Sequence, residues 1–516
     1  MDTLPNSKIQ TGFFRAGIAL LAVLLGIVVL PTLNLGLVGD DYFLLVNDRG
    51  LPLTQSIDQL HRPLRNIVLK SMGSLIGIHH VLAYRILVAG TFLAVLVFLF
   101  MLLRRMKVSS FAALAGVFVV AFYPRNREVL FWFAAWQDLV AAAAVLVACL
   151  LFLKYREAGS TYTLWSAAIV YGIALGFKET AVVVLVFLLL IDLYRSEHIR
   201  ELWQRRLWHA YIPLVCVLLI YVIYFFADSG WASLAGRRTG GFYGFKNISS
   251  VLSGVARAVI GLLLPFSGLL GLKSVRPWHV VVILFELGTA AVLAWRSRQW
   301  RALLLAAAWV LCAILPTAAF AGIINADRYL LVPMLGVGIL VALLVHQLTG
   351  GPRPIGPVTA VSLLCLVYSL SAVGYLVRDR QEWRRGGEEA TAIIRDTVEV
   401  GAKLPANSEL DVANVTPIYE SGAAVLGNGL SEALHADGLS RSIRVIMNPA
   451  SKEPEQIELT ARLQRCAIGT AERATARRIV LIEIDGHILP DRGECGAEIV
   501  DNDRTRRPRA WTILYP

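Results

Sequence analysis

The sequence predicts an α-helical polytopic membrane protein with about eleven membrane-spanning helices and a small C-terminal soluble α/β domain. Composition gives the first reason. The 516 residues are 56% hydrophobic and only 17% charged, with a mean hydropathy of +0.62. A water-soluble core cannot bury so much apolar surface. The second reason is that apolar stretches recur along the chain, and the third is that Lys and Arg cluster in alternate gaps between them.

The apolar stretches have the character of membrane spans, although several are shorter than the usual length of about 20 residues. They lie near residues 13–30, 81–103, 110–123, 132–153, 163–176, 180–195, 208–226, 279–295, 301–320, 329–348 and 357–377. The first follows Lys8 and Arg15, as in a signal peptide. Because no small-residue cleavage pattern follows it, we interpret it as a retained helix.

Basic clusters predict the orientation of these spans. They occur near residues 104–107, 154–156, 195–206 and 296–301. The positive-inside rule places these loops and the N-terminus in the cytoplasm. The loops at 31–80, 124–131, 227–278 and 321–328 then face outward, as does the tail. The stretch Ile248–Leu272 is interpreted as re-entrant or interfacial, because a full crossing would reverse every later loop.

The same basic loops account for the net charge of +12 without nucleic acid as a partner. The composition changes near residue 378, which predicts a transmembrane domain over 1–377 and an extracytoplasmic soluble domain over 378–516. In the second domain, Glu388–Val400 predicts a helix and Ile479–Ile484 a buried strand. Cys466 and Cys495 also lie there, either as a disulfide or as free thiols.

Several acidic residues are candidates for chemistry at the predicted outer surface. Asp40 and Asp41 directly follow the first span, and Glu128 lies in the second outward loop. A carboxylate there can take a proton from a hydroxyl group, or the aspartate pair can hold a divalent cation such as Mg²⁺ or Mn²⁺. Asp138 lies ten positions after Glu128 in an apolar helix. The alternative readings are a solvated turn for the aspartates and structural salt bridges for Glu128 and Asp138.

Cations are predicted on the same side of the membrane. They are Arg62 beside His61 in the first loop, Lys178 beside Glu179, and Arg328 beside Tyr329. An arginine fork suits a lipid-linked phosphate, and a fixed cation stabilises negative charge on a departing phosphate. Arg328 is the first candidate for this role. The alternatives are interfacial anchoring of Arg328 with Tyr329 and mutual pairing of Lys178 with Glu179.

The order of these motifs resembles the glycosyltransferase C superfamily. Within it, the chain is most similar to the multi-spanning O-mannosyltransferases that carry tetratricopeptide repeats, over about residues 36–385. The matching motifs are Asp40-Asp41, Arg62-Pro63-Leu64, Pro124 to Glu128, Gln137-Asp138-Leu139, Lys178-Glu179 and Ala326-Asp327-Arg328-Tyr329-Leu330. Two features depart from the family: the tail lacks the repeats, and Arg125 and Arg127 replace the usual neighbours of Glu128.

The resemblance implies an inverting transfer of a monosaccharide from a polyprenyl-phosphate or dolichyl-phosphate carrier to a protein or glycan hydroxyl. It assigns Asp40, Asp41 and Glu128 as the family's acids, with a first-loop aspartate as general base. It leaves the need for a metal open. It also favours a bacterial inner membrane, which would place the tail in the periplasm.

Two other functions are compatible with a polytopic chain. A transporter or lipid-carrier flippase would line a path across the bilayer with ionisable residues and would show internal repeats. The sequence has no such symmetry. A non-enzymatic scaffold presenting the tail would explain the spans but not the concentration of carboxylates and arginines in the outward loops.

Overall fold

The computed structural model describes most of the helical region and part of the tail. The described residues are 4–46, 52, 62–195, 207–227, 247–266, 276–296, 300–321, 326–350, 355–403, 406, 409–415, 426, 430–449, 478–484 and 487–490. His61, Cys466 and Cys495 lie outside them, so the predictions made for these residues stay predictions.

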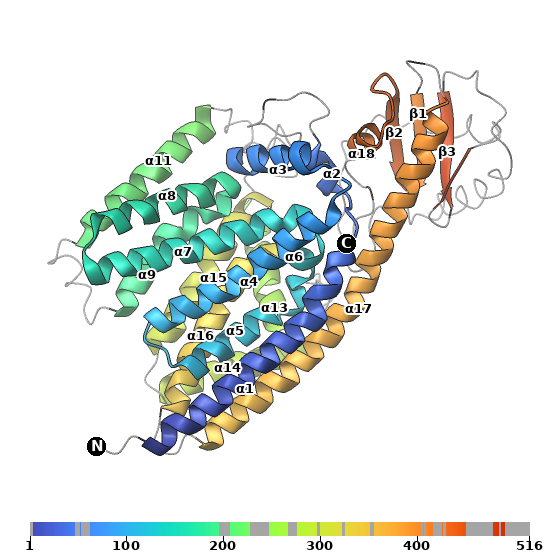
Figure 1. Ribbon diagram of the computed structural model, residues 1–516. Helices are drawn as coiled ribbons and strands as arrows, with labels where there is room; N and C mark the ends of the chain where they lie inside the picture. Colours follow the sequence, from blue (N-terminus) through green and yellow to red (C-terminus); the bar gives the residue numbers. More distant parts are fainter. Residues whose placement is uncertain are drawn as a thin grey trace.

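A bundle of α-helices makes up the region before the tail (Figure 1). The longer helices are α1 (Leu4–Val29), α4 (Val81–Arg105), α5 (Ser110–Ala121), α7 (Trp136–Ala158), α8 (Thr161–Phe177), α9 (Val184–Arg195), α11 (Ile212–Ala227), α13 (Ile248–Leu263), α14 (Pro277–Arg296), α15 (Trp300–Ala321), α16 (Leu331–Thr349) and α17 (Ile355–Gly401). Each predicted apolar stretch coincides with one of them.

Seven helical segments of the described chain are long and apolar enough to cross a membrane. They correspond to α1, α4, α7, α11, α15, α16 and α17, and α5, α8, α13 and α14 are shorter apolar helices. This supports a multi-pass membrane protein, because an apolar helix satisfies its own backbone groups in lipid. A total of about eleven spans stays a prediction.

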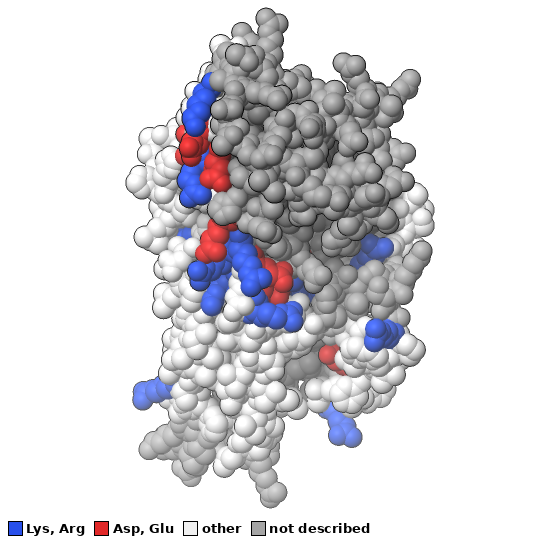
Figure 2. Space-filling view, turned by 90° about the vertical axis from the view of Figure 1, so that its right-hand side faces the viewer, with Lys and Arg blue, Asp and Glu red and all other residues white. Residues whose placement is uncertain are grey.

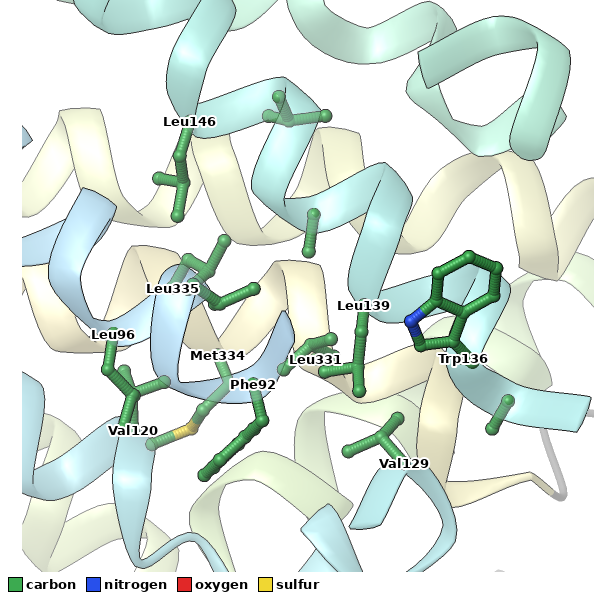
Figure 3. Close-up of a cluster of buried hydrophobic side chains, with 14 of the residues drawn as sticks. Phe92, Leu96, Val120, Val129, Trp136, Leu139, Leu146, Leu331, Met334 and Leu335 are labelled. Carbon is green, nitrogen blue, oxygen red and sulfur yellow. The ribbon is translucent and has the colours of Figure 1, made fainter. Parts of the chain in front are cut away.

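The core forms where α4, α5, α7 and α16 meet. Figure 3 shows Phe92 and Leu96 from α4 packed with Val120, Leu139 and side chains of α16. Phe92, Val120 and Leu139 are fully buried. Helices in lipid associate by close packing rather than by burial from water. Small residues provide that closeness here: a Cβ on Gly116 would overlap the carbonyl oxygen of Gly338, so α5 and α16 approach backbone to backbone.

Large apolar side chains cover much of the outer surface of the bundle. Phe285 and Trp295 on α14 are 73% and 84% exposed, and Ile220 and Ile223 on α11 are similarly exposed. Such contiguous apolar surface is stable in hydrocarbon and not in water. Figure 2 shows charged side chains of both signs grouped near mid-height on one face, above a broad surface with few charges.

Helix α17 connects the bundle to the tail. It runs alongside α1 and continues without interruption to Gly401, beyond the bundle (Figure 1). The helix predicted over Glu388–Val400 is therefore the last part of α17. The predicted division at residue 378 falls inside this helix, and two separate domains stay a prediction.

A four-stranded sheet forms the described part of the tail. Its strands are β1 (Glu409–Val415), β2 (Arg444–Pro449), β3 (Arg478–Ile484) and β4 (His487–Pro490), in the order β2-β1-β3-β4. The first three are parallel, and β4 is antiparallel to β3. Strand β3 matches the predicted strand. Helix α18 (Leu430–Ala436) packs against α2 (Asp40–Leu45), which begins with the aspartate pair.

Candidate functional site

The aspartate pair opens α2, directly after Gly39 turns the chain with a φ of 48°. Asp41 is fully buried, and each of its carboxylate oxygens accepts a backbone hydrogen bond. Oδ2 accepts from the Val38 N–H at 2.9 Å, and Oδ1 from the Ala134 N–H at 2.6 Å. Burial raises the pKa of Asp41 to about 7, against the opposing effect of nearby Arg85. Asp40, by contrast, is only partly buried.

Arg85 on α4 holds the backbone around this pair. Its buried guanidinium donates to the carbonyl oxygens of Leu35 at 2.9 Å and Phe131 at 2.7 Å, and also to that of Gly36. These bonds tie the end of the first span to the segment containing Ala134. Arg85 was not among the predicted site residues, although an arginine inside an apolar stretch indicates an internal partner.

Arg62 precedes α3 (Pro63–Ile76) and forms a two-point ion pair with Glu179. Its Nε and Nη2 atoms lie 2.6 Å from the two carboxylate oxygens of Glu179, and Nη1 donates to Gln137 Oε1 at 2.9 Å. Burial alone would raise the pKa of Glu179, but Arg62 lowers it to about 2. Glu179 therefore pairs with Arg62 and not with Lys178, the alternative considered from the sequence.

Lys178 ends α8 and is buried. Its ammonium group pairs with Asp138 near the start of α7, so the partner of Asp138 is this lysine and not an arginine, as the alternative reading of a structural salt bridge had it. The same Nζ atom lies 4.6 Å from the centre of the Tyr329 ring. Burial lowers the pKa of Lys178, and Asp138 opposes this effect. Lys178 and Asp138 thus bring two predicted site residues from separate helices together.

Arg328 lies in the short helix η7 (Asp327–Leu330) and pairs with Glu128 at 3.2 Å. Its guanidinium carbon lies 4.6 Å from the centre of the Trp132 ring and 5.1 Å from that of Tyr329. Burial raises the pKa of Glu128, and the charge of Arg328 opposes this effect. Glu128 therefore pairs with a residue 200 positions away and not with Arg125 or Arg127.

A second ionic group, missed by sequence analysis, supports η7. Asp327 is fully buried between Arg125, at 2.9 Å, and Arg127, at 2.6 Å. Arg127 also reaches Asp379 on α17 at 2.8 Å. The two arginines that depart from the family pattern are therefore the partners of Asp327, and the position of Arg328 depends on them. Asp379 had no sequence signal beyond being a charge near the end of an apolar stretch.

These contacts connect most of the predicted site residues. The connected set is Arg62, Glu179, Asp138, Lys178, Tyr329, Arg328 and Glu128. Asp41 joins it through Ala134, which precedes Gln137 by one helical turn. The contacts above do not include Asp40.

The aspartate pair does not fit a divalent cation in this arrangement. Both oxygens of Asp41 already accept backbone N–H groups. The described residues contain no group of three His, Cys, Asp or Glu side chains placed to hold a metal ion. Mg²⁺ and Mn²⁺ need several oxygen ligands. We therefore derive no chemical step through a metal.

Comparisons with known proteins give one informative result. No protein-family model and no curated protein matches this sequence. Among solved structures, ArnT from Cupriavidus metallidurans in the apo state matches with a TM-score of 0.50 and 14% identity. The match covers 92% of this chain and 93% of that chain. The chain therefore shares its overall fold with ArnT.

Proposed function

We propose that this protein transfers a monosaccharide from a polyprenyl-phosphate carrier to an acceptor hydroxyl on the extracytoplasmic side of a membrane. The observation that carries the proposal is the convergence of Arg62, Lys178 and Arg328. These cations come from three elements far apart in the chain and are connected through Gln137, Asp138 and Tyr329. The motif resemblance to the glycosyltransferase C superfamily supports the same class of reaction, and the fold shared with ArnT agrees with it.

A cluster of this kind suits a departing lipid phosphate. When the bond between the sugar and the phosphate breaks, negative charge develops on the phosphate oxygens. A cation fixed beside those oxygens stabilises the transition state more than the ground state. Arg328 is best placed for this role. Its 3.2 Å pair with Glu128 is longer than the 2.6 Å contacts of Arg62, and its side chain keeps 14% exposure.

The general base is assigned to Asp40. A base must be within reach of the acceptor hydroxyl, and Asp41 is fully buried, with both oxygens accepting backbone N–H groups. Asp40 is partly accessible and adjacent. Its carboxylate removes the proton as the hydroxyl oxygen forms a bond to the anomeric carbon. The opposite bond breaks, its electron pair passes to the phosphate, and the configuration inverts. Asp41 then serves to fix α2.

The remaining assignments follow the resemblance. We infer an acceptor on a protein or glycan, as for the O-mannosyltransferases, and a bacterial inner membrane with the tail in the periplasm. The contact between α18 and α2 places the tail beside the proposed base, where an acceptor would approach. The division into a transferase region over 1–377 and a soluble region over 378–516 is part of the same proposal.

The test is sugar transfer by purified protein in liposomes. Radiolabelled monosaccharides on polyprenyl phosphate are supplied with a panel of peptide and glycan acceptors. Asp40→Asn should lower kcat by about 10²–10⁴-fold with the fold intact. Glu388→Gln serves as the control, because that carboxylate is 61% exposed in a pair on α17.

Full activity of Asp40→Asn would contradict the assignment of the base. If the wild type transferred no sugar but moved labelled carrier lipid between the leaflets, the protein would be a flippase and the proposal would be wrong.

A further inference from the structure

Helix α13 is amphipathic and begins with a defined cap. The Asn247 side chain accepts a hydrogen bond from the Ser250 N–H at 2.9 Å. One face of the helix is buried and consists mainly of small residues, namely Gly254, Ala258, Gly261 and Leu262. The other face carries Ile248, which is 79% exposed, and Leu252, which is 64% exposed. This pattern matches a helix at a boundary between protein and lipid.

The buried face of α13 lies directly on the ionic groups of the site. The Tyr123 hydroxyl donates to the Gly261 carbonyl oxygen at 3.0 Å. A Cβ on Gly261 would lie 3.1 Å from Leu330 Cδ1 and 3.6 Å from Arg125 Nε. The glycine therefore allows α13 to approach η7 and the Asp327 group closely.

Arg257 lies one helical turn before Gly261 and differs from the other arginines of this region. It is partly buried, and its Nε atom is shielded from solvent with no hydrogen-bond partner. Within the described part of the chain, no carboxylate pairs with it. Arg62, Arg125 and Arg127 each have a carboxylate within 3 Å. Gly254 and Gly261, three residues before and four after, flank Arg257 without side chains.

The shielded Nε donor of Arg257 is left without an acceptor, and the guanidinium stays protonated, so an anion at this position would satisfy both the donor and the charge. A phosphate group has the charge and the oxygens to satisfy it. We propose that Arg257 binds the phosphate group of a lipid on α13, beside the site. Ile248 and Leu252 are exposed on the opposite side of the same helix, which suits α13 to a position at the lipid boundary, where a lipid phosphate is available.

Binding of the polyprenyl carrier at Arg257 rests on the proposed function, whereas binding of a membrane phospholipid does not. The phosphate belongs either to the polyprenyl carrier or to a membrane phospholipid. In both cases Arg257 supplies the donors, and the experiment below separates the sources.

Binding is measured without any acceptor, so that it does not depend on sugar transfer. Full-length protein in nanodiscs of neutral lipid is titrated with undecaprenyl phosphate and, separately, with phosphatidylglycerol. Arg257→Gln is compared with the wild type. Arg296→Gln is the matched control, an exposed arginine at the end of the neighbouring helix α14. Loss of one charge-assisted contact should weaken binding by about 10- to 100-fold.

A loss confined to undecaprenyl phosphate assigns the site to the carrier, and a loss for phosphatidylglycerol assigns it to a phospholipid headgroup. Equal binding of both lipids by Arg257→Gln and wild type would overturn the proposal, whether or not the protein transfers sugar.

A second measurement uses only wild-type protein, so it does not depend on the folding of the variant. Phenylglyoxal modification of Arg257 is followed by peptide mass spectrometry, and saturating lipid should slow it at least about tenfold, in line with the expected change in affinity. Modification of Arg257 at the same rate with and without either lipid would also overturn the proposal.

Discussion

Removal of the Asp379 charge should destabilise the protein far more than removal of another carboxylate on the same helix. Asp379 and Glu388 both lie on α17, and each pairs with an arginine. The Asp379 carboxylate is 3% exposed and lies 2.8 Å from Arg127. Glu388 is 61% exposed and lies 2.7 Å from Arg384. The two pairs therefore have similar lengths but different surroundings.

The expected losses in the free energy of unfolding follow from the burial of each pair. Removing one partner of a buried pair costs about 3–5 kcal/mol, because the remaining charge stays desolvated. In the Asp379→Asn variant, Arg127 still pairs with Asp327 at 2.6 Å. We therefore expect a loss at the lower end of this range, about 3 kcal/mol. Water screens the Glu388 pair, and Glu388→Gln should cost about 0.3–0.5 kcal/mol.

The assay is unfolding in mixed micelles with increasing SDS, at low and at high salt. Salt should reduce the small effect of Glu388→Gln and leave that of Asp379→Asn unchanged, since a buried pair is poorly screened. A loss below about 1 kcal/mol for Asp379→Asn, or equal losses in the two variants, would refute the reasoning that burial makes this pair structurally important.

Other predictions concern α2, η7 and helix packing. Burial raises the pKa of Asp41 from its ordinary 3.8 to about 7. The folded state therefore binds the Asp41 carboxyl proton more tightly than the unfolded state does. Stability should then decrease as pH rises through this range, and melting curves of Asp41→Asn should lack the decrease. Arg328→Lys should lower kcat at least about tenfold, because lysine loses the planar fork; unchanged kinetics would contradict its role. Gly73→Ala would overlap the Leu45 carbonyl oxygen and should lower both melting temperature and transfer, whereas Gly90→Ala meets no atom within 4 Å and should lower neither.

The sequence predicted the helices well, because each needs only a local apolar run. It also placed Arg62, Lys178, Arg328 and Glu128 on one side of the membrane, and the structure connects them. It did not predict their partners. Arg328 and Glu128 are 200 positions apart, and a hydropathy pattern gives the end of each helix but not which ends meet. Arg85 was visible as a charge in an apolar stretch, but its partners are distant backbone carbonyl groups, which no side-chain motif indicates.

The end of α17 shows a second limit of hydropathy. The apolar part of this helix stops near residue 377, but the helix continues to Gly401. Its outer part is held by charged side chains, including the i,i+4 pair of Arg384 and Glu388, and by buried Trp383. Loss of hydrophobicity marks where lipid contact ends and does not mark where the helix ends. A domain boundary drawn from composition therefore falls inside an element that connects the two parts.

The ionic groups of the site divide into a fixed part and an exchangeable part. Asp327 is fully buried between two arginines and holds the backbone of η7. The next residue, Arg328, pairs with Glu128 at 3.2 Å and keeps 14% exposure. If the protein binds a lipid phosphate as proposed, we expect the phosphate to exchange with Glu128 on Arg328 while Asp327 keeps its two arginines. The free-energy cost of desolvating Asp327 is already offset by its two arginines in the folded protein. Lipid binding therefore needs to offset only the loss of the contact between Glu128 and Arg328. Asp327 thus fixes the position of η7, and the adjacent Arg328 keeps the 14% exposure through which we expect a ligand to reach it.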